Sequence, residues 1–355
     1  MSIGKWWSFR HQHLPKAKWE IARGGMQGIL EDALHPSPGF CCMLWQFDTD
    51  NSTFSLKRAG RKQLHMRFGL ALPNVGRYSD IATLVDLALL AERDGWDGIF
   101  LWDTLHYQAD SQEVCDPWIA LTALALNTER IHIGTMVTAL TRRRPWKVAR
   151  ETATLDRLSG GRLILGVGAG DEGDKGFTHF GEEQDSRTRA KLLDESLDIL
   201  NGLWSGEPFS YSGEHYQVQE ITFLPTPLQQ PRIPVWIAGT WPRKGPMLRA
   251  ARWDGVNAFA QREDGTLGEI LPEEVVQLRA FMDEHRESDL PLDIVVSSNV
   301  FAAYDDEDAQ ALLIDYKDAG VSWCLQSVWP ETDPEDVRTG LQRGRDTWYK
   351  YALRE

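Results

Sequence analysis

Short apolar runs alternate with longer amphipathic segments from Arg67 to the end of the chain. The apolar runs are rich in Val, Ile and Leu, a composition typical of strands that are covered on both faces. The amphipathic segments repeat apolar residues at the spacing of one helix face, and several end at glycine. This order of strand, polar corner and helix predicts a series of βα units.

The pattern predicts eight strands and eight helices in strict alternation. The strands are expected at residues 67–72, 98–102, 131–138, 163–167, 233–238, 255–259, 293–301 and 321–328. The helices are expected at residues 79–94, 116–127, 145–159, 187–204, 242–252, 272–285, 306–318 and 334–349. Ser79 is expected to cap the first helix, and Pro242 to open the fifth.

This alternation predicts a closed (β/α)₈ TIM barrel. A doubly wound open sheet is the alternative, because alternation alone does not reveal closure. Residues 205–232 are rich in Pro, Tyr and Gly and form an insertion between the fourth helix and the fifth strand. One or two short strands are expected there, at the mouth of the barrel.

The first 65 residues lack a sustained strand or helix period and carry scattered Trp, His and basic residues. We expect an N-terminal extension at residues 1–65 that is poorly ordered or not native, and a barrel at residues 66–355. Met66 is then the expected biological start. The apolar stretch 21–34 is interrupted by charged residues and glycines, which argues against a secretory signal.

Composition narrows the function classes. The chain has 355 residues, 42% hydrophobic and 25% charged, which is ample for one barrel. Its net charge of −14 argues against a nucleic-acid partner, because phosphate backbones attract basic surfaces. No apolar run reaches the roughly 18 residues of a membrane span, so no membrane association is expected. Four cysteines without paired metal-ligand spacing indicate a reduced, cytoplasmic protein.

The working residues of a barrel lie at the C-terminal ends of its strands, and several chemistries are missing there. The first strand has no HxH motif for a metal, no predicted strand ends in a lysine for Schiff-base chemistry, and no GxSxG elbow is present. No metal is therefore expected. Glycines, small hydroxyls and one or two carboxylates remain, a lining better suited to holding a cofactor.

Two polar side chains follow the second strand. Asp103 comes directly after the apolar run GIFLW, where a carboxylate would hydrogen-bond a ring or take a proton. A helix cap or a loop acid is the alternative. His106 lies three residues on and is the second catalytic candidate, with a solvated loop histidine as the alternative. The run Arg142 to Arg144 is most simply a charged loop, or else it holds an anionic cofactor tail.

Glycines mark two further strand ends. Gly168 and Gly170 remove side chains where the fourth strand ends, which allows close approach of a flat or anionic ligand, although such a pair also makes simple turns. Gly239 and Thr240 offer backbone donors, a hydroxyl and a following helix N-terminus, a plausible phosphate seat or a plain strand-to-helix turn. Four tryptophans near the strand ends are candidates for the wall of the site or for partly buried core: Trp102, Trp118, Trp241 and Trp329.

Several ordered segments resemble one family. RIHIGTMVTALTRRRP, ETATLDRLSGGRLILGVGAG, FGEE with the following LLDESLDILNGLW, and PRIPVWIAGT are similar to the luciferase-like monooxygenase superfamily, which includes relatives of bacterial luciferase and F420-dependent oxidoreductases. The resemblance covers the chain from Met66 to the C-terminus. It implies a (β/α)₈ barrel that binds reduced FMN or coenzyme F420 at its C-terminal mouth.

The resemblance also implies roles for individual residues. A non-proline cis peptide is expected between Met136 and Val137, against one face of the ring system. Residues from Gly168 and Gly170 to Asp171 are expected along the cofactor, with Gly239 and Thr240 at its phosphate. Asn74, at the end of the first strand, and Asp103 complete the cofactor-binding set. Members that use F420 commonly have a histidine after this aspartate, where the present chain has Thr104.

Several functions follow from the resemblance. The leading expectation is a monooxygenase that uses reduced FMN and oxygen on a small organic substrate, with a separate flavin reductase. The alternative is hydride transfer with F420 on the same barrel, and a further alternative is a flavin-binding barrel without turnover. A phosphate-binding barrel lyase would be favoured if neither cofactor bound. Because relatives in this family are often dimers, a homodimer is a candidate assembly.

Overall fold

The computed structural model describes residues 46–48, 53–55, 66–107, 113–171, 174–298 and 307–352. The chain divides into two compact units, Met1–Lys62 and Gln63–Glu355. In the first unit, β1 (Gln46–Asp48) pairs antiparallel with β2 (Thr53–Ser55). The rest of the prediction for residues 1–65 lies outside the described residues.

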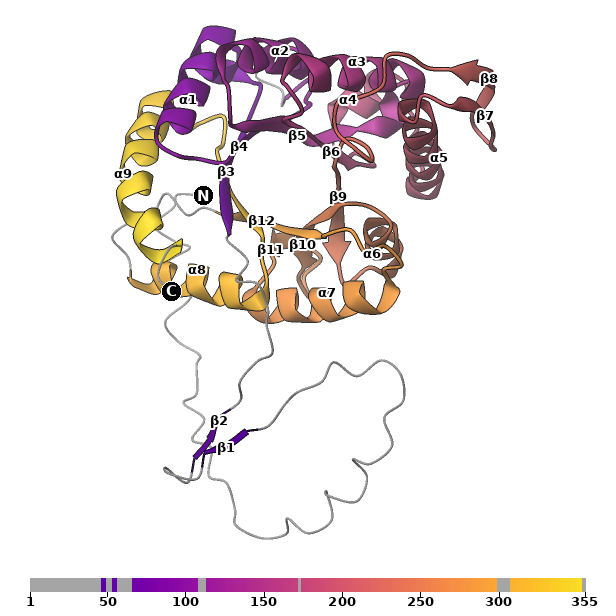
Figure 1. The fold of residues 1–355 in the computed structure, drawn as a ribbon. Helices are drawn as coiled ribbons and strands as arrows, with labels where there is room; N and C mark the ends of the chain where they lie inside the picture. The colour runs from indigo at the N-terminus through magenta and orange to yellow at the C-terminus, as the bar shows by residue number, and fades with distance from the viewer. Residues whose placement is uncertain are drawn as a thin grey trace, which may run out of the picture. The chain divides into compact units, whose positions relative to one another are not determined.

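The second unit is a closed barrel of parallel strands (Figure 1). In chain order these are β3 (Arg67–Leu72), β4 (Gly98–Leu101), β5 (His132–Ala139), β6 (Leu163–Gly168), β9 (Val235–Trp241), β10 (Gly255–Gln261), β12 (Asp293–Ser298) and β13 (Trp323–Ser327). Pairing of β9 with β6 on one side and with β10 on the other closes the ring. The predicted TIM barrel is confirmed, and the open sheet is excluded.

Helices surround the ring of strands (Figure 1). The long ones are α1 (Ile81–Arg93), α2 (Pro117–Asn127), α3 (Pro145–Leu158), α5 (Ser186–Trp204), α6 (Lys244–Ala251), α7 (Pro272–His285), α8 (Glu307–Ala319) and α9 (Pro334–Ala352). The short ones are η4 (Gly76–Ser79), η5 (Leu140–Arg142) and α4 (Lys175–Thr178).

Two helix starts differ from their predictions. The α1 cap is Asp80, not Ser79, because the carboxylate accepts hydrogen bonds from the backbone N–H groups of residues 82 and 83. Ser79 lies in η4 instead. The fifth long helix, α6, begins at Lys244 rather than at Pro242, because β9 continues to Trp241.

Alternation along the strands separates two cores. Odd and even positions of β4 illustrate it, since Ile99 and Leu101 join the layer between strands and helices while Phe100 joins the barrel interior. In the interior, Phe100, Trp236 and Trp323 pack with ring centroids 5.0 to 5.8 Å apart. These rings fill the centre of the barrel, as the inward side chains of an eight-stranded barrel are expected to do.

Glycines on the inner face make room for these rings. A Cβ at Gly98 would lie 2.7 Å from a ring carbon of Phe100, and one at Gly255 would lie 2.2 Å from a ring carbon of Trp236. Large and small side chains therefore interlock inside the barrel.

The barrel carries two additional strand pairings, one in the insertion and one at β11. The insertion forms an antiparallel hairpin of β7 (Pro208–Ser212) and β8 (Gln217–Thr222), as predicted. Its turn is held by the buried carboxylate of Glu195 on α5, which accepts hydrogen bonds from the backbone N–H groups of residues 214 to 216. The sequence did not predict β11 (Leu267–Glu269), which pairs antiparallel with β10. None of the described helices is long and apolar enough to cross a membrane.

Candidate functional site

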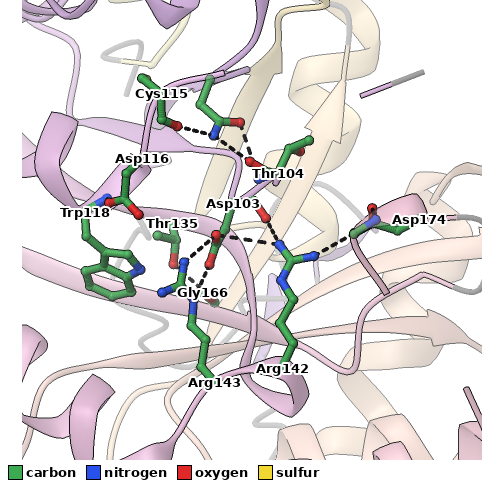
Figure 2. A network of polar contacts seen from close by, with 12 residues as sticks. Asp103, Thr104, Cys115, Asp116, Trp118, Thr135, Arg142, Arg143, Gly166 and Asp174 are labelled. Carbon is green, nitrogen blue, oxygen red and sulfur yellow. Dashed lines mark hydrogen bonds and ion pairs between the residues drawn. The ribbon is translucent and has the colours of Figure 1, made fainter. Parts of the chain in front are cut away.

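A buried ion-pair network joins the ends of β4 and β5 (Figure 2). Arg143 donates from Nε to Oδ2 of Asp103 over 2.8 Å and from Nη2 to Oδ1 over 2.7 Å. The Asp103 side chain has no exposed surface. Burial opposes the positive charge of Arg143, but the hydrogen bonds to Asp103 hold the pKa of the guanidinium above its usual value. Arg143 therefore keeps its positive charge.

Arg142 connects the same network to the loop after β6. It donates to the backbone carbonyl of Asp103 and, over 2.8 Å, to Oδ2 of Asp174. Its guanidinium lies over the ring of Phe177, 5.3 Å from the centroid, and only 2% of its side chain is exposed. The arginine run was expected to be a charged loop; Arg142 instead ends η5, and its charge is buried in this network.

The structure gives Asn74 a bracing role. Its Nδ2 donates to the backbone carbonyl of Thr104 over 3.0 Å and to that of Cys115 over 2.7 Å. The side chain is fully buried. Asn74 therefore fixes the loop that carries Asp103. Its predicted contact with a cofactor stays a prediction.

The end of β6 lies against the end of β5. A Cβ at the buried Gly168 would lie 3.1 Å from Cγ2 of Val137 and 3.8 Å from Cβ of Ala238. The Met136–Val137 peptide is cis, as the resemblance implied. Val137 is partly exposed, and Gly168 and Ala238 add only small groups beside it. Small side chains of three strands thus meet at the mouth of the barrel.

Backbone conformation and packing both explain the glycine at position 170. Its φ of +85° is a conformation that glycine adopts without strain, and a Cβ there would lie 2.2 Å from the ring of Phe177. The next residue, Asp171, is exposed. The glycine is required by the packing of Phe177, whether or not a ligand lies nearby.

The predicted phosphate seat differs from its expected geometry. Gly239 and Thr240 lie inside β9 and pair with residues 258 and 259 of β10, so the helix N-terminus does not follow them directly. A Cβ at Gly239 would lie 2.7 Å from Met247 and 2.8 Å from Pro246, so this glycine lets α6 pack closely. Thr240 has the same parity as the inward Trp236, so it lies on the face of β9 opposite to Gly239.

His106 lies near α4. Its ring stacks on that of His179, with centroids 6.0 Å apart and planes 5° apart. Its Nδ1 is buried and has no hydrogen-bond partner among the residues that the structure describes. The structure therefore brings His106 close to the segment after β6 that contains α4 and His179.

One inward polar residue was missed. Asn257 is 1% exposed, donates from Nδ2 to Sδ of Met136 over 3.0 Å, and accepts from Oγ of Ser297 over 3.4 Å. The available signal was a single amide in the apolar strand GVNAFA. It links the inner ends of β10, β12 and β5.

The chemistry of this site is limited. Asp103 is held by two arginines, and the described residues contain no cluster of three or more His, Cys, Asp or Glu that could hold a metal. The hydroxyl of Thr138 is buried, with no hydrogen-bond partner in the described part of the chain. Small side chains beside buried, unpartnered polar atoms fit a flat cofactor that has its own polar edge.

Comparisons with known proteins identify the family of the chain. The luciferase-like monooxygenase family model matches residues 66–351. The chain is 36% identical over 163 residues to the F420-dependent glucose-6-phosphate dehydrogenase of Microbacterium testaceum, covering 45% of this chain and 47% of that protein. It is 29% identical over 184 residues to the oxygenase component of the flavin-dependent trigonelline monooxygenase of Acinetobacter baylyi, half of each chain. The chain thus spans about half the length of these curated relatives.

A solved structure supports the fold. Monooxygenase RslO1 from Streptomyces bottropensis superposes with a TM-score of 0.63 at 19% identity, covering 80% of this chain and 99% of that one. The two sequence relatives depend on F420 and on flavin, the two cofactor classes that the sequence predicted. The match over residues 66–351 confirms the resemblance, and the chain belongs to the luciferase-like monooxygenase family.

Proposed function

We propose that this chain is a flavin-dependent oxidoreductase, a monooxygenase that uses reduced FMN and oxygen on a small organic substrate. The carrying observation is the meeting of Val137, Gly168 and Ala238 at the mouth. The carboxylate at the end of β4, Asp103, is already bound by two arginines. A site with a flat, small-residue surface and an occupied acid favours redox chemistry that a bound cofactor supplies.

The residues take distinct parts in this proposal. Val137 and Gly168 support the ring system, and Met136 fixes Val137 from the barrel interior through its contact with Asn257. Thr240 donates its hydroxyl to the phosphate, and Gly239 allows the helix behind it to approach. The reduced flavin, when bound, supplies the electrons for oxygen activation.

The polar residues position and protect the site. Arg142 and Arg143 tie together the loops after β4, β5 and β6, which keeps water from entering between them. Asp103 is best described as a positioning residue in this scheme, since both of its oxygens receive hydrogen bonds from Arg143. His106, whose ring stacks on that of His179, exchanges a proton with the substrate, and Asp171 contacts the cofactor from the loop after β6.

Hydride transfer with F420 is the second candidate. The observation that favours it is the 36% identity to an F420-dependent dehydrogenase over 163 residues. Thr104 weakens it, because a threonine cannot relay a proton at neutral pH as a histidine does. The backbone of Thr104 is bound by Asn74 on both its N–H and its carbonyl.

Partners follow from the same proposal. A separate reductase would deliver the reduced flavin, consistent with the name of the Acinetobacter relative, an oxygenase component. A second copy of this chain would cover α2, whose sequence is apolar on all sides and which exposes Ile119 and Leu126 by 63% and 66%. Sedimentation of the purified chain, compared with an Ile119→Lys variant, tests the dimer. A cytoplasmic location stays a prediction.

Cofactor titration tests the function. The purified protein is titrated with FMN, reduced FMN and F420, followed by the absorbance and fluorescence of the ring. Binding of reduced FMN together with oxygen-dependent turnover of a substrate supports the proposal and excludes a binding protein without turnover. Selective F420 binding would favour the second candidate, and no binding of either cofactor would favour a lyase.

A matched pair of ligands isolates the phosphate seat. FMN carries a phosphate that riboflavin lacks, so Thr240→Val is expected to weaken FMN binding by about tenfold and to leave riboflavin binding unchanged. An equal loss of affinity for FMN and for riboflavin would show that Thr240 does not contact the phosphate.

A further inference from the structure

We propose that Trp102 and Trp329 form an aromatic platform at the mouth of the barrel that binds uncharged, planar aromatic molecules. This inference deepens the proposed function by naming the substrate class. The two indole rings meet edge to face, with centroids 5.7 Å apart and planes at 80°. The ring of Tyr107 lies 6.1 Å from that of Trp102 and extends the same surface.

The strand order brings the two tryptophans together. β3 lies between β4 and β13 in the barrel. The backbone N–H of Trp102 donates to the carbonyl of Leu72 over 2.9 Å, and that of Val328 donates to the carbonyl of Ala71 over 2.9 Å. The backbone segments that carry the two tryptophan rings are thus both hydrogen-bonded to the end of β3.

Side-chain alternation directs the platform inward. Phe100 points into the barrel and Leu101 points outward, so Trp102 has the inward parity. On β3 the inward residue Ala71 pairs with Phe100, in the layer below Trp102, and its small side chain leaves space above it for the rings of its neighbours. The platform therefore lies at the C-terminal end of the barrel interior, above the layer of Phe100.

The loop that carries Trp329 is anchored at several points. The hydroxyl of Tyr78 donates to the carbonyl of Thr332 over 2.9 Å, and Arg77 forms an ion pair with Asp333. The N–H of Thr332 donates to the carbonyl of Trp329 over 2.9 Å. Trp329 nevertheless remains 50% exposed. An indole held in place with half of its surface exposed at the working end of a barrel is arranged to receive a ligand.

The other two candidate tryptophans do not join this surface. Trp118 is 6% exposed and lies beside the guanidinium of Arg143. Trp241 packs edge to face on Phe281 of α7, in the layer of helices. Only the pair beside β3 combines mutual contact with exposure among these four.

The chemistry of the platform selects its ligand. Edge-to-face and stacked ring contacts favour aromatic molecules over saturated molecules of equal size. The ion pair of the same loop, between Arg77 and Asp333, neutralises itself and offers no net charge to a ligand. An uncharged aromatic molecule is therefore the expected class.

The test compares 4-methylphenol with 4-methylcyclohexanol, which differ in the aromatic ring but little in size. Both are titrated into the full-length protein and followed by ligand-observed NMR. We expect 4-methylphenol to bind about three- to tenfold more tightly. Trp329→Leu should abolish this preference and Trp329→Phe should retain it. Trp146→Leu, a control at a 39%-exposed tryptophan on α3, should leave it unchanged.

The outcomes are decisive in both directions. Equal binding of the two probes to the unaltered protein, or an unchanged preference in Trp329→Leu, would overturn the platform. The same variants are titrated with FMN and F420, whose binding should not change. If neither cofactor binds but the preference for 4-methylphenol holds, the proposed function fails and the platform stands. If a cofactor binds but the preference is absent, the platform fails and the proposed function stands.

Discussion

Arg143 binds both carboxylate oxygens of Asp103, with donor-to-acceptor distances of 2.7 and 2.8 Å, and the acid has no exposed side-chain surface. Two-pronged contacts of this kind fix the relative orientation of two side chains. They also occupy the hydrogen-bonding sites that a proton-transferring acid would use. The end of β4 is thereby fastened to the segment after β5.

Removing this acid is expected to destabilise the protein strongly. Asp103→Ala leaves the guanidinium of Arg143 without its partner, while Arg142 keeps Asp174, and the loss should lower the free energy of unfolding by about 3 to 5 kcal/mol. Urea unfolding measures the change. The control is Asp333→Ala, which removes the acid of an ion pair whose side chains are 64% and 50% exposed and should cost less than about 1 kcal/mol. A catalytic Asp103 would instead show near-normal stability with lost turnover.

Gly170 offers a prediction with a closely matched control. Gly170→Ala combines a φ of +85° with a Cβ 2.2 Å from the ring of Phe177. Gly265→Ala has a similar φ of +83° but nothing within 4 Å of the added Cβ. We expect the first substitution to lower stability by at least about 1 kcal/mol more than the second, because overpacking adds to backbone strain. Similar unfolding midpoints for the two variants would show that the ring of Phe177 moves aside without a cost in stability.

Gly168 is expected to control cofactor binding. Gly168→Ala places a methyl group 3.1 Å from Val137 at the proposed ring-binding surface. We expect about tenfold weaker binding of the flavin, equivalent to 1.4 kcal/mol. Gly245→Ala on α6 is the control, since nothing lies within 4 Å of its added Cβ. Fluorescence titration gives both affinities. Undiminished binding in Gly168→Ala would show that the flavin ring does not lie against β6.

His132 should make stability depend on pH. Burial lowers the pKa of this histidine, although its hydrogen bond to the carbonyl of Asp97 acts in the opposite direction. The unfolded chain, with a histidine pKa of about 6.5, therefore binds more protons in the window below that value. Stability is fully present above about pH 6.5 and decreases as the pH falls towards the folded pKa.

The matching variant is His132→Phe, which keeps an aromatic ring beside Trp323 but cannot be protonated. The difference in unfolding free energy between the two proteins should change in favour of the variant as the pH falls from about 7 to 5. Parallel stability curves over this range would contradict the assignment.

Local sequence determined the elements of the barrel. Covered strands read as apolar runs, and amphipathic helices read as a 3.6-residue repeat, because each depends on burial of one side chain after another along a short segment. The helix predicted at residues 272–285 has those bounds in the structure as α7. The hairpin strand β11 was missed because its three residues are partly or fully exposed and carry no apolar pattern.

Tertiary structure decided how the strand ends work together. The sequence placed Asp103 at a strand end, but its partners lie 39 and 40 residues away, and no local pattern encodes that Arg142 and Arg143 turn inward to meet it. The sequence likewise offered four tryptophans without separating Trp102 and Trp329 from the rest. Pairing of β4 with β5, and of β3 with both β4 and β13, made these encounters, because residues distant in sequence become neighbours when parallel strands align their C-terminal ends.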